Sequence, residues 1–194
     1  MLSWLYSKPT PEELAQRALI EAEAELFEEI RMISQFEIKE IKRLKTIFYN
    51  ITNDNNDMTL TEFFTIQCIF ISPFREKIAK IFGFTHQKLY INVKEFICGI
   101  SLFNSIIPSN RINKMRVAFQ LQDIDNDGVI TLTDLIIYLN LVSNNKLETY
   151  ERKEISQHIL NEISSDNNKK FITFTDYQRF LTTTDFQMKL HLPI

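Results

Sequence analysis

The stretch D-I-D-N-D-G-V-I-T-L-T-D, residues 123–134, decides how the rest of the chain is interpreted. Asp123, Asp125 and Asp127 alternate in it, so a loop can turn three carboxylates toward one hard cation. Gly128 stands at the sixth place, where the chain must turn sharply and a side chain would obstruct the turn. Because helical patterns flank the stretch on both sides, it predicts a cation-binding loop rather than a solvated acidic turn.

The order of the donors is that of an EF-hand loop. Val129 can add its backbone carbonyl at the seventh place, and Thr131 at the ninth can bind directly or through a water. Asp134 closes the loop at the twelfth place. The predicted metal ligands are therefore Asp123, Asp125, Asp127, Val129, Thr131 and Asp134.

Asp134 departs from the motif, which has Glu at this place. Asp is one methylene shorter, so we expect it to give the ion one oxygen where Glu gives two. Fewer ligands suit the octahedral Mg²⁺ ion better than the roughly seven-oxygen cage that Ca²⁺ prefers. The sequence thus predicts one site, for Ca²⁺ or for Mg²⁺, and not a high-affinity calcium switch.

Composition limits the classes of protein to which the chain can belong. Its 194 residues are 44% apolar, with sixteen Phe against three Gly and five Pro, which indicates a helical protein with a sizeable core. The net charge of −3 argues against a general nucleic-acid binder. No run of about 18 apolar residues is present to span a membrane.

The two cysteines, Cys68 and Cys98, lie in apolar helical stretches and are expected to be small buried residues rather than a disulfide. That favours a reducing compartment, and we expect a cytoplasmic protein. A peripheral place on a membrane or a cytoskeletal complex, or an organelle, stays open. Leu2 follows Met1, so N-myristoylation, which needs glycine there, is not expected.

A unit of helix, polar loop and helix repeats from Phe36 onward. The loop-closing acids Glu62, Glu95, Asp134 and Asp176 recur every 33 to 42 residues. The predicted fold is all-α, with four EF-hand units in two paired lobes and an added N-terminal helix. The predicted segments are an N-terminal apolar head and acidic helix (1–35), an N-lobe (36–104), a linker (105–111), a C-lobe (112–183) and a tail (184–194).

The other three loops lack the donors of the third. The first has Ile51 at its first place and Asn56 in place of glycine, so we expect an Asn/Asp-rich turn, with weak ion binding left open. The second has no carboxylate before Glu95, and in the fourth Lys169 would repel an ion. Such loops can still pair as antiparallel ribbons through their eighth places, which are Met58 with Ile91 and Ile130 with Ile172.

The N-terminal helix is predicted to begin at T-P-E-E (10–13), where Thr10 is the N-cap, Pro11 opens the first turn and Glu13 completes a capping box. We expect it to reach about Ile33. Residues 11–35 carry seven acids and two bases, a net charge of −5. A narrow apolar seam is formed by Ala15, Leu19, Ala22, Leu26 and Ile33.

Whether the helix that covers this seam belongs to the chain or to a partner is open. Trp4, Leu5 and Tyr6, ahead of the helix, are either a packed start or an anchor in a partner.

Four stretches resemble the calcineurin B family, which includes the calcineurin regulatory subunit and homologues that bind Na⁺/H⁺ exchangers. They are E-I-K-R-L (40–44), S-P-F-R-E-K-I-A-K-I-F (72–82), V-K-E-F-I-C-G-I-S-L-F (93–103) and K-M-R-V-A-F-Q-L-Q-D-I-D-N-D-G (114–128). The resemblance covers about residues 36–183. It implies a non-catalytic protein that clasps an amphipathic helix of a larger protein in an apolar groove.

This chain differs from the family in its ion loops. The resemblance implies four ions and an N-terminal myristoyl group for calcineurin B itself, whereas this chain has one convincing loop. We therefore expect a regulatory or structural EF-hand subunit of a multi-subunit assembly. The alternative is a Ca²⁺-sensing regulatory subunit of a calcineurin-type phosphatase.

Apolar residues on the helices that leave the loops favour such a groove. They are Phe63, Phe64, Ile66, Ile69 and Phe70 after the first loop, and Leu135, Ile136, Leu139 and Leu141 after the third. Catalysis is not expected, because His86, His158 and His191 are isolated in sequence and Cys68 has no base beside it.

Overall fold

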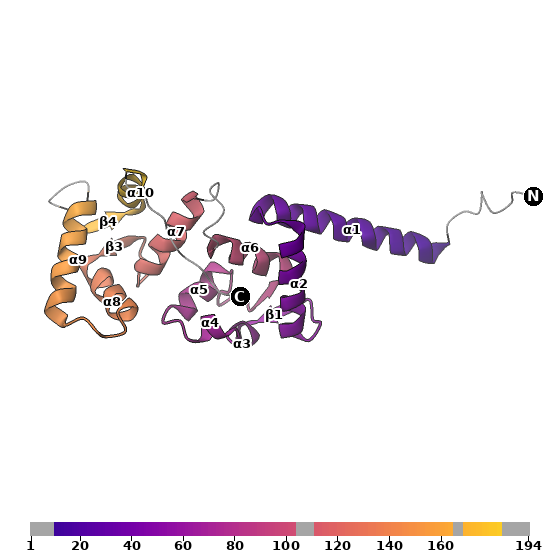
Figure 1. The fold of residues 1–194 in the computed structure, drawn as a ribbon, viewed down its shortest axis with the longest axis horizontal. Coiled ribbons are helices and arrows are strands. Elements are labelled where there is room, and N and C mark those ends of the chain that lie inside the picture. The colour runs from indigo at the N-terminus through magenta and orange to yellow at the C-terminus, as the bar shows by residue number, and fades with distance from the viewer. Residues whose placement is uncertain (1–9, 104–110, 165–168, 184–194) are drawn as a thin grey trace, which may run out of the picture.

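A computed structural model describes residues 10–103, 111–164 and 169–183, without the side chains of 182 and 183. The described residues form ten helices and two short antiparallel ribbons (Figure 1). This confirms the predicted all-α EF-hand fold. None of the helices in these ranges has the length and apolar content needed to cross a membrane. The apolar head at residues 4–6, most of the predicted linker and the tail from residue 184 lie outside the described residues.

The first half of the molecule builds one ribbon. Met58 lies opposite Ile91 in it, as their matching loop places predict, and both side chains are fully buried. The elements are α2 (Ile38–Thr52), β1 (Asp57–Thr59), α3 (Leu60–Phe63), α4 (Gln67–Phe70), α5 (Arg75–Ile81), β2 (Tyr90–Asn92) and α6 (Val93–Phe103).

The second half repeats this arrangement. Ile130 lies opposite Ile172, again with both side chains buried. The elements are α7 (Arg111–Gln122), β3 (Val129–Thr131), α8 (Leu132–Val142), α9 (Thr149–Ile163), β4 (Phe171–Thr173) and α10 (Phe174–Thr183).

The helix after the first loop is broken, although the sequence suggested one apolar exit helix. α3 ends at Phe63, and α4 starts only after Ile66, whose backbone is extended. At the break, the hydroxyl of Thr65 donates to the carbonyl of Glu62 at 2.6 Å, a local bond that competes with helix continuation. The break turns Ile66 and Ile69 into the core and leaves Phe70 60% exposed.

Helix α1 (Pro11–Ser34) begins at the predicted capping box and projects away from the rest of the molecule (Figure 1). The side chains of residues 11–25 are exposed, including Leu19 of the predicted seam. Only the last third of the helix packs on the protein, against α2 and α6. There Ile30 is buried and Ile33 is 49% exposed, so placing Ile33 in the packed seam was wrong. The contact face follows Leu26, Ile30 and Ser34, a spacing of four.

Two apolar clusters form the core, one in each half. Aromatic rings dominate the first: Phe63 and Phe82 lie 4.8 Å apart between ring centroids, and Phe82 stacks on Phe103 at 6.0 Å. Gly99 of α6 lies directly under the Phe82 ring, where an added Cβ would come within 2.5 Å of a ring carbon. Glycine at this place therefore lets the ring approach the α6 backbone.

The two halves contact each other through α7. Val117 and Leu121 belong to the core cluster of the first half, although the other buried apolar residues of α7 join the second. Phe74, just before α5, lies against Tyr138 of α8 with 5.4 Å between ring centroids. The first half therefore reaches both helices that flank the third loop.

Candidate metal centre

The third loop is shaped by its own side chains. Asn126 and Gly128 have positive φ angles of 63° and 90°, which turn the chain back toward β3. The amide of Gly128 donates to Oδ2 of Asp123 at 3.0 Å, and the amide of Val129 donates to Oδ1 of Asp127 at 2.9 Å. These bonds hold the loop in a compact turn between α7 and β3.

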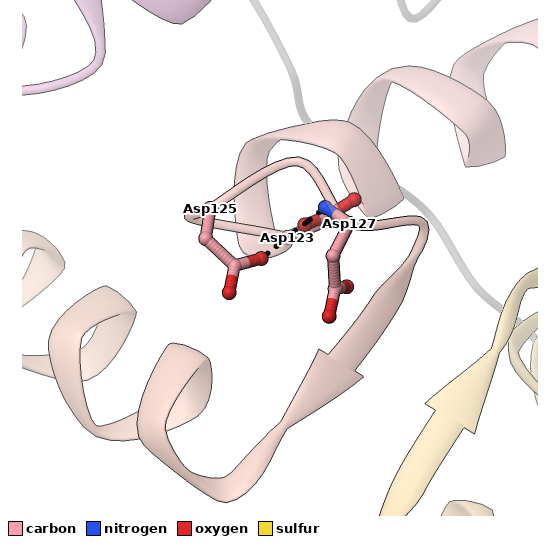
Figure 2. Close-up of side chains that lie close together, drawn as sticks. All are labelled: Asp123, Asp125 and Asp127. Carbon is pink, nitrogen blue, oxygen red and sulfur yellow. Dashed lines mark hydrogen bonds between the residues drawn. The ribbon is translucent and has the colours of Figure 1, made fainter.

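The loop brings three carboxylates together at its centre (Figure 2). One oxygen from each of Asp123, Asp125 and Asp127 lies within 4.8 Å of the others. Among the described residues, this is the one group of three or more acidic, His or Cys side chains that meets such a spacing. The spacing suits oxygen ligands arranged around a single hard cation.

Asp123 is the buried member of this group. Its side chain is 5% exposed, and its Oδ1 atom is buried with no hydrogen-bond partner. Burial raises the pKa of the Asp123 carboxyl, against the lowering effects of the Gly128 and Asn126 amides and of the Lys77 ammonium. An unpaired buried carboxylate oxygen is costly, and a cation at the loop centre would relieve that cost.

Asp134 ties the two ends of the loop together instead of joining the group of three. Its Oδ1 accepts from the amide of Ile124 at 3.1 Å, and its Oδ2 accepts from the amide of Thr131 at 2.8 Å and from the Thr131 hydroxyl. Thr131 and Asp134 also form the capping box that starts α8. The structure thus places both residues at the loop, together with the backbone of Val129 in β3.

Lys77 reaches the loop from α5 and was missed in the sequence. Its ammonium donates to the backbone carbonyls of Asp123 and Gln120, the latter at 3.1 Å, and to Oδ1 of Asn126 at 2.9 Å. Burial lowers the pKa of Lys77, while the loop carboxylates, Asp123 foremost, oppose that lowering. No sequence signal could have identified it, because it lies 46 residues from Asp123 and the contact depends on how the halves meet.

The first loop does not gather its acids. Asp54 and Asp57 are exposed, and Glu62 accepts from the amide and hydroxyl of Thr59, both at 2.7 Å. The side-chain amide of Asn55 donates back to the carbonyl of Thr52 at 2.7 Å. These are the contacts of a turn closed by its own polar groups.

Comparison with known proteins supports the relationship that the sequence suggests. No family model matches the chain. Curated proteins named as calcineurin B subunits do match it: 29% identity over 164 residues in Naegleria gruberi, 26% over 162 in Yarrowia lipolytica and 28% over 160 in Kluyveromyces lactis. These alignments cover 82 to 84% of this chain and 89 to 91% of the relatives.

Paired helix-loop-helix units joined by short ribbons define the chain as an EF-hand protein. Within that class, the similarity over most of its length shows a divergent calcineurin B-like protein.

Proposed function

We propose that this protein is a non-catalytic EF-hand subunit that binds one Ca²⁺ ion and holds an amphipathic helix of a larger protein against α8. The observation that carries this proposal is the composition and exposure of α8. Eight of its eleven residues, L-T-D-L-I-I-Y-L-N-L-V, are apolar or aromatic, and they leave no broad polar face. A helix that is apolar all round is expected to be covered on all sides.

The chain itself does not cover α8 completely. Leu135 is buried, whereas Ile137 and Val142 are 39% and 49% exposed. Ile136 and Leu139, on the same helix, are half-buried. An exposed apolar strip of this kind is what a helix-in-groove partner covers.

Residues before and along α5 form a wall at one end of this strip. A cavity of about 500 Å³ lies there, between Phe74 and Leu141, with Ile124 of the third loop also lining it. Its rim carries Arg75, Lys77 and Lys80 against one acid, Glu76. The apolar lining and the mostly basic rim favour an amphipathic helix that places an acidic group at this end.

The metal centre would act through the start of α8. The predicted ligands Asp123, Asp125 and Asp127, with the Val129 carbonyl, Thr131 and Asp134, would surround the ion. Asp134 is the third residue of α8 and precedes the buried Leu135, so ion binding would steady the helix that carries the partner surface. Because Asp134 is short and its oxygens already accept loop hydrogen bonds, Mg²⁺ is the competing ion.

A regulatory rather than catalytic role fits the relatives, which are named as a subunit of calcineurin. Within the described residues, His86 and His158 are exposed, and His158 has only Glu162 nearby, at 3.5 Å. A Ca²⁺-sensing subunit of a calcineurin-type phosphatase is the second candidate, favoured by the names of these relatives. The altered twelfth ligand counts against such a sensor.

A labelled amphipathic leucine–lysine helix, with glutamate at one end, tests the proposed surface. We expect Ile137→Glu and Val142→Glu to weaken its binding at least tenfold by fluorescence anisotropy, while Leu14→Glu on the exposed part of α1 leaves it unchanged. Equal binding by all variants would contradict the assignment to α8.

Capture from native material separates the two candidates. A complex that survives chelator supports a structural subunit, and chelator-dependent capture of a phosphatase supports the sensor.

A further inference from the structure

The second and fourth loops each place a lysine against the acid that closes the loop. Lys88 precedes Glu95 by seven residues, and Lys169 precedes Asp176 by seven. In the third loop the residue at this place is Asp127, one of the clustered carboxylates. Two loops therefore carry a cationic side chain where the third loop carries a carboxylate for an ion.

In the second loop the lysine contacts the closing acid directly. The ammonium of Lys88 donates to Oε1 of Glu95, whose Oε2 accepts from the amide of Asn92 at 3.1 Å. Partial burial raises the pKa of the Glu95 carboxyl, but the Lys88 and Asn92 hydrogen bonds outweigh it and lower the pKa overall. The carboxylate is thus held in its charged form by the chain itself.

In the fourth loop the closing acid is more deeply buried. The Asp176 side chain is 5% exposed, and its Oδ2 lies 3.6 Å from the Lys169 ammonium while accepting from the Thr173 hydroxyl at 2.7 Å. Arg179 lies 3.7 Å from the other oxygen. A buried carboxylate needs compensating charge and hydrogen bonds, and here side chains provide both.

We propose that Lys88 and Lys169 are internal replacements for the metal ion, so that the second and fourth loops close on the chain's own ammonium groups. β2 follows the second loop's lysine and β4 follows the fourth's, and each pairs with a strand of the other type of loop. Each ribbon therefore has one loop that needs no external cation. This deepens the proposed function: the fold that holds the partner persists when Ca²⁺ is removed.

Urea unfolding of the full-length chain in EDTA, followed by circular dichroism, tests the proposal without a partner or an ion. Lys88→Met and Lys169→Met keep the aliphatic stem and remove the charge. We expect both to lower the midpoint, Lys169→Met more strongly because Asp176 is more buried than Glu95. The controls Lys80→Met and Lys170→Met remove exposed charges nearby and should leave the midpoint unchanged.

A second comparison separates charge from packing. In Glu95→Gln and Asp176→Asn backgrounds the acid is neutral, so the same lysine substitutions should shift the midpoint by less than half as much. If Asp176→Asn does not fold, Lys169→Arg, which keeps the charge, should retain most of the stability that Lys169→Met loses. Unchanged midpoints in the methionine variants, or equal shifts in the neutral backgrounds, would overturn the proposal. Neither result depends on whether α8 binds a partner.

Discussion

Asp123 and Asp134 are buried carboxylates at the two ends of the third loop, but their oxygens are bonded differently. Oδ1 of Asp123 has no partner, whereas both oxygens of Asp134 accept hydrogen bonds from Ile124 and Thr131. Asp123 is therefore the carboxylate that an ion would stabilise most. Asp134 already has a structural role, which an ion must share or displace.

Replacing Asp125 with Ala should abolish ion binding, because it removes one of three clustered carboxylates. Titration calorimetry of the unchanged protein should show about one divalent ion per chain, and none for the variant. Asp57→Ala removes an exposed acid of the first loop and serves as the control. Two sites of comparable affinity in the unchanged protein would show that another loop also binds.

Replacing Asp134 with Glu should raise Ca²⁺ affinity by roughly tenfold and shift preference away from Mg²⁺. The longer side chain can supply two oxygens to the ion while the Thr131 capping box persists, since Glu is the usual acid of that motif. Competition titrations with the two ions measure the shift. An unaltered preference would mean that α8 already brings Asp134 close enough to the ion.

At the scale of the element, α6 depends on a residue without a side chain. Gly99 faces the ring of Phe82, which is itself 3% exposed and stacked on Phe103. The ring has no solvent side toward which to move. The contact between α6 and the residues that follow α5 is thus set by the absence of one Cβ.

Gly99→Ala should destabilise the protein by about 1–3 kcal/mol, because the added methyl overpacks a filled core. The gain in helix propensity from Gly to Ala, about 1 kcal/mol, offsets only part of this cost. Thermal unfolding measures the loss, and Phe82→Leu in the same chain should recover some of it by making room. A Gly99→Ala variant as stable as the parent would show that the ring shifts without cost.

At the scale of the whole molecule, α1 joins an exposed acidic rod to a buried anchor (Figure 1). Residues 11–25 are exposed, while Ile30 lies in the core, and Glu29 forms an ion pair with Lys94 of α6. Among the principal contacts between elements, α1 meets α2 and α6 and not α8. The rod therefore leaves the proposed partner surface open.

Deleting residues 1–25 should leave the core intact and binding to the leucine–lysine helix unchanged. Deleting residues 1–35 should cost at least about 2–5 kcal/mol, because it removes the buried Ile30 side chain and opens a cavity against α6. Chemical unfolding of both truncations gives the difference. Loss of helix binding on removing residues 1–25 would place the partner surface on α1.

The sequence by itself determined the helix-loop-helix repeat, the pairing of Met58 with Ile91 and of Ile130 with Ile172, and the start of α1. These features depend on residue spacing and local hydrogen bonds, which are written along the chain. It also identified the loop whose three carboxylates the structure gathers, because alternating acids before a glycine define such a turn locally. The four-unit domain division and the complete ligand set stay predictions.

Only the tertiary structure decided which apolar residues are covered and which cations meet the loops. Ile33 and Ile30 are both consistent with a buried helix face, and only the direction in which α1 crosses α6 buries Ile30. Lys77 reaches the third loop from α5, across 46 residues of sequence. Such contacts depend on how whole elements pack, and the energy of packing is set by neighbours that are distant in the chain.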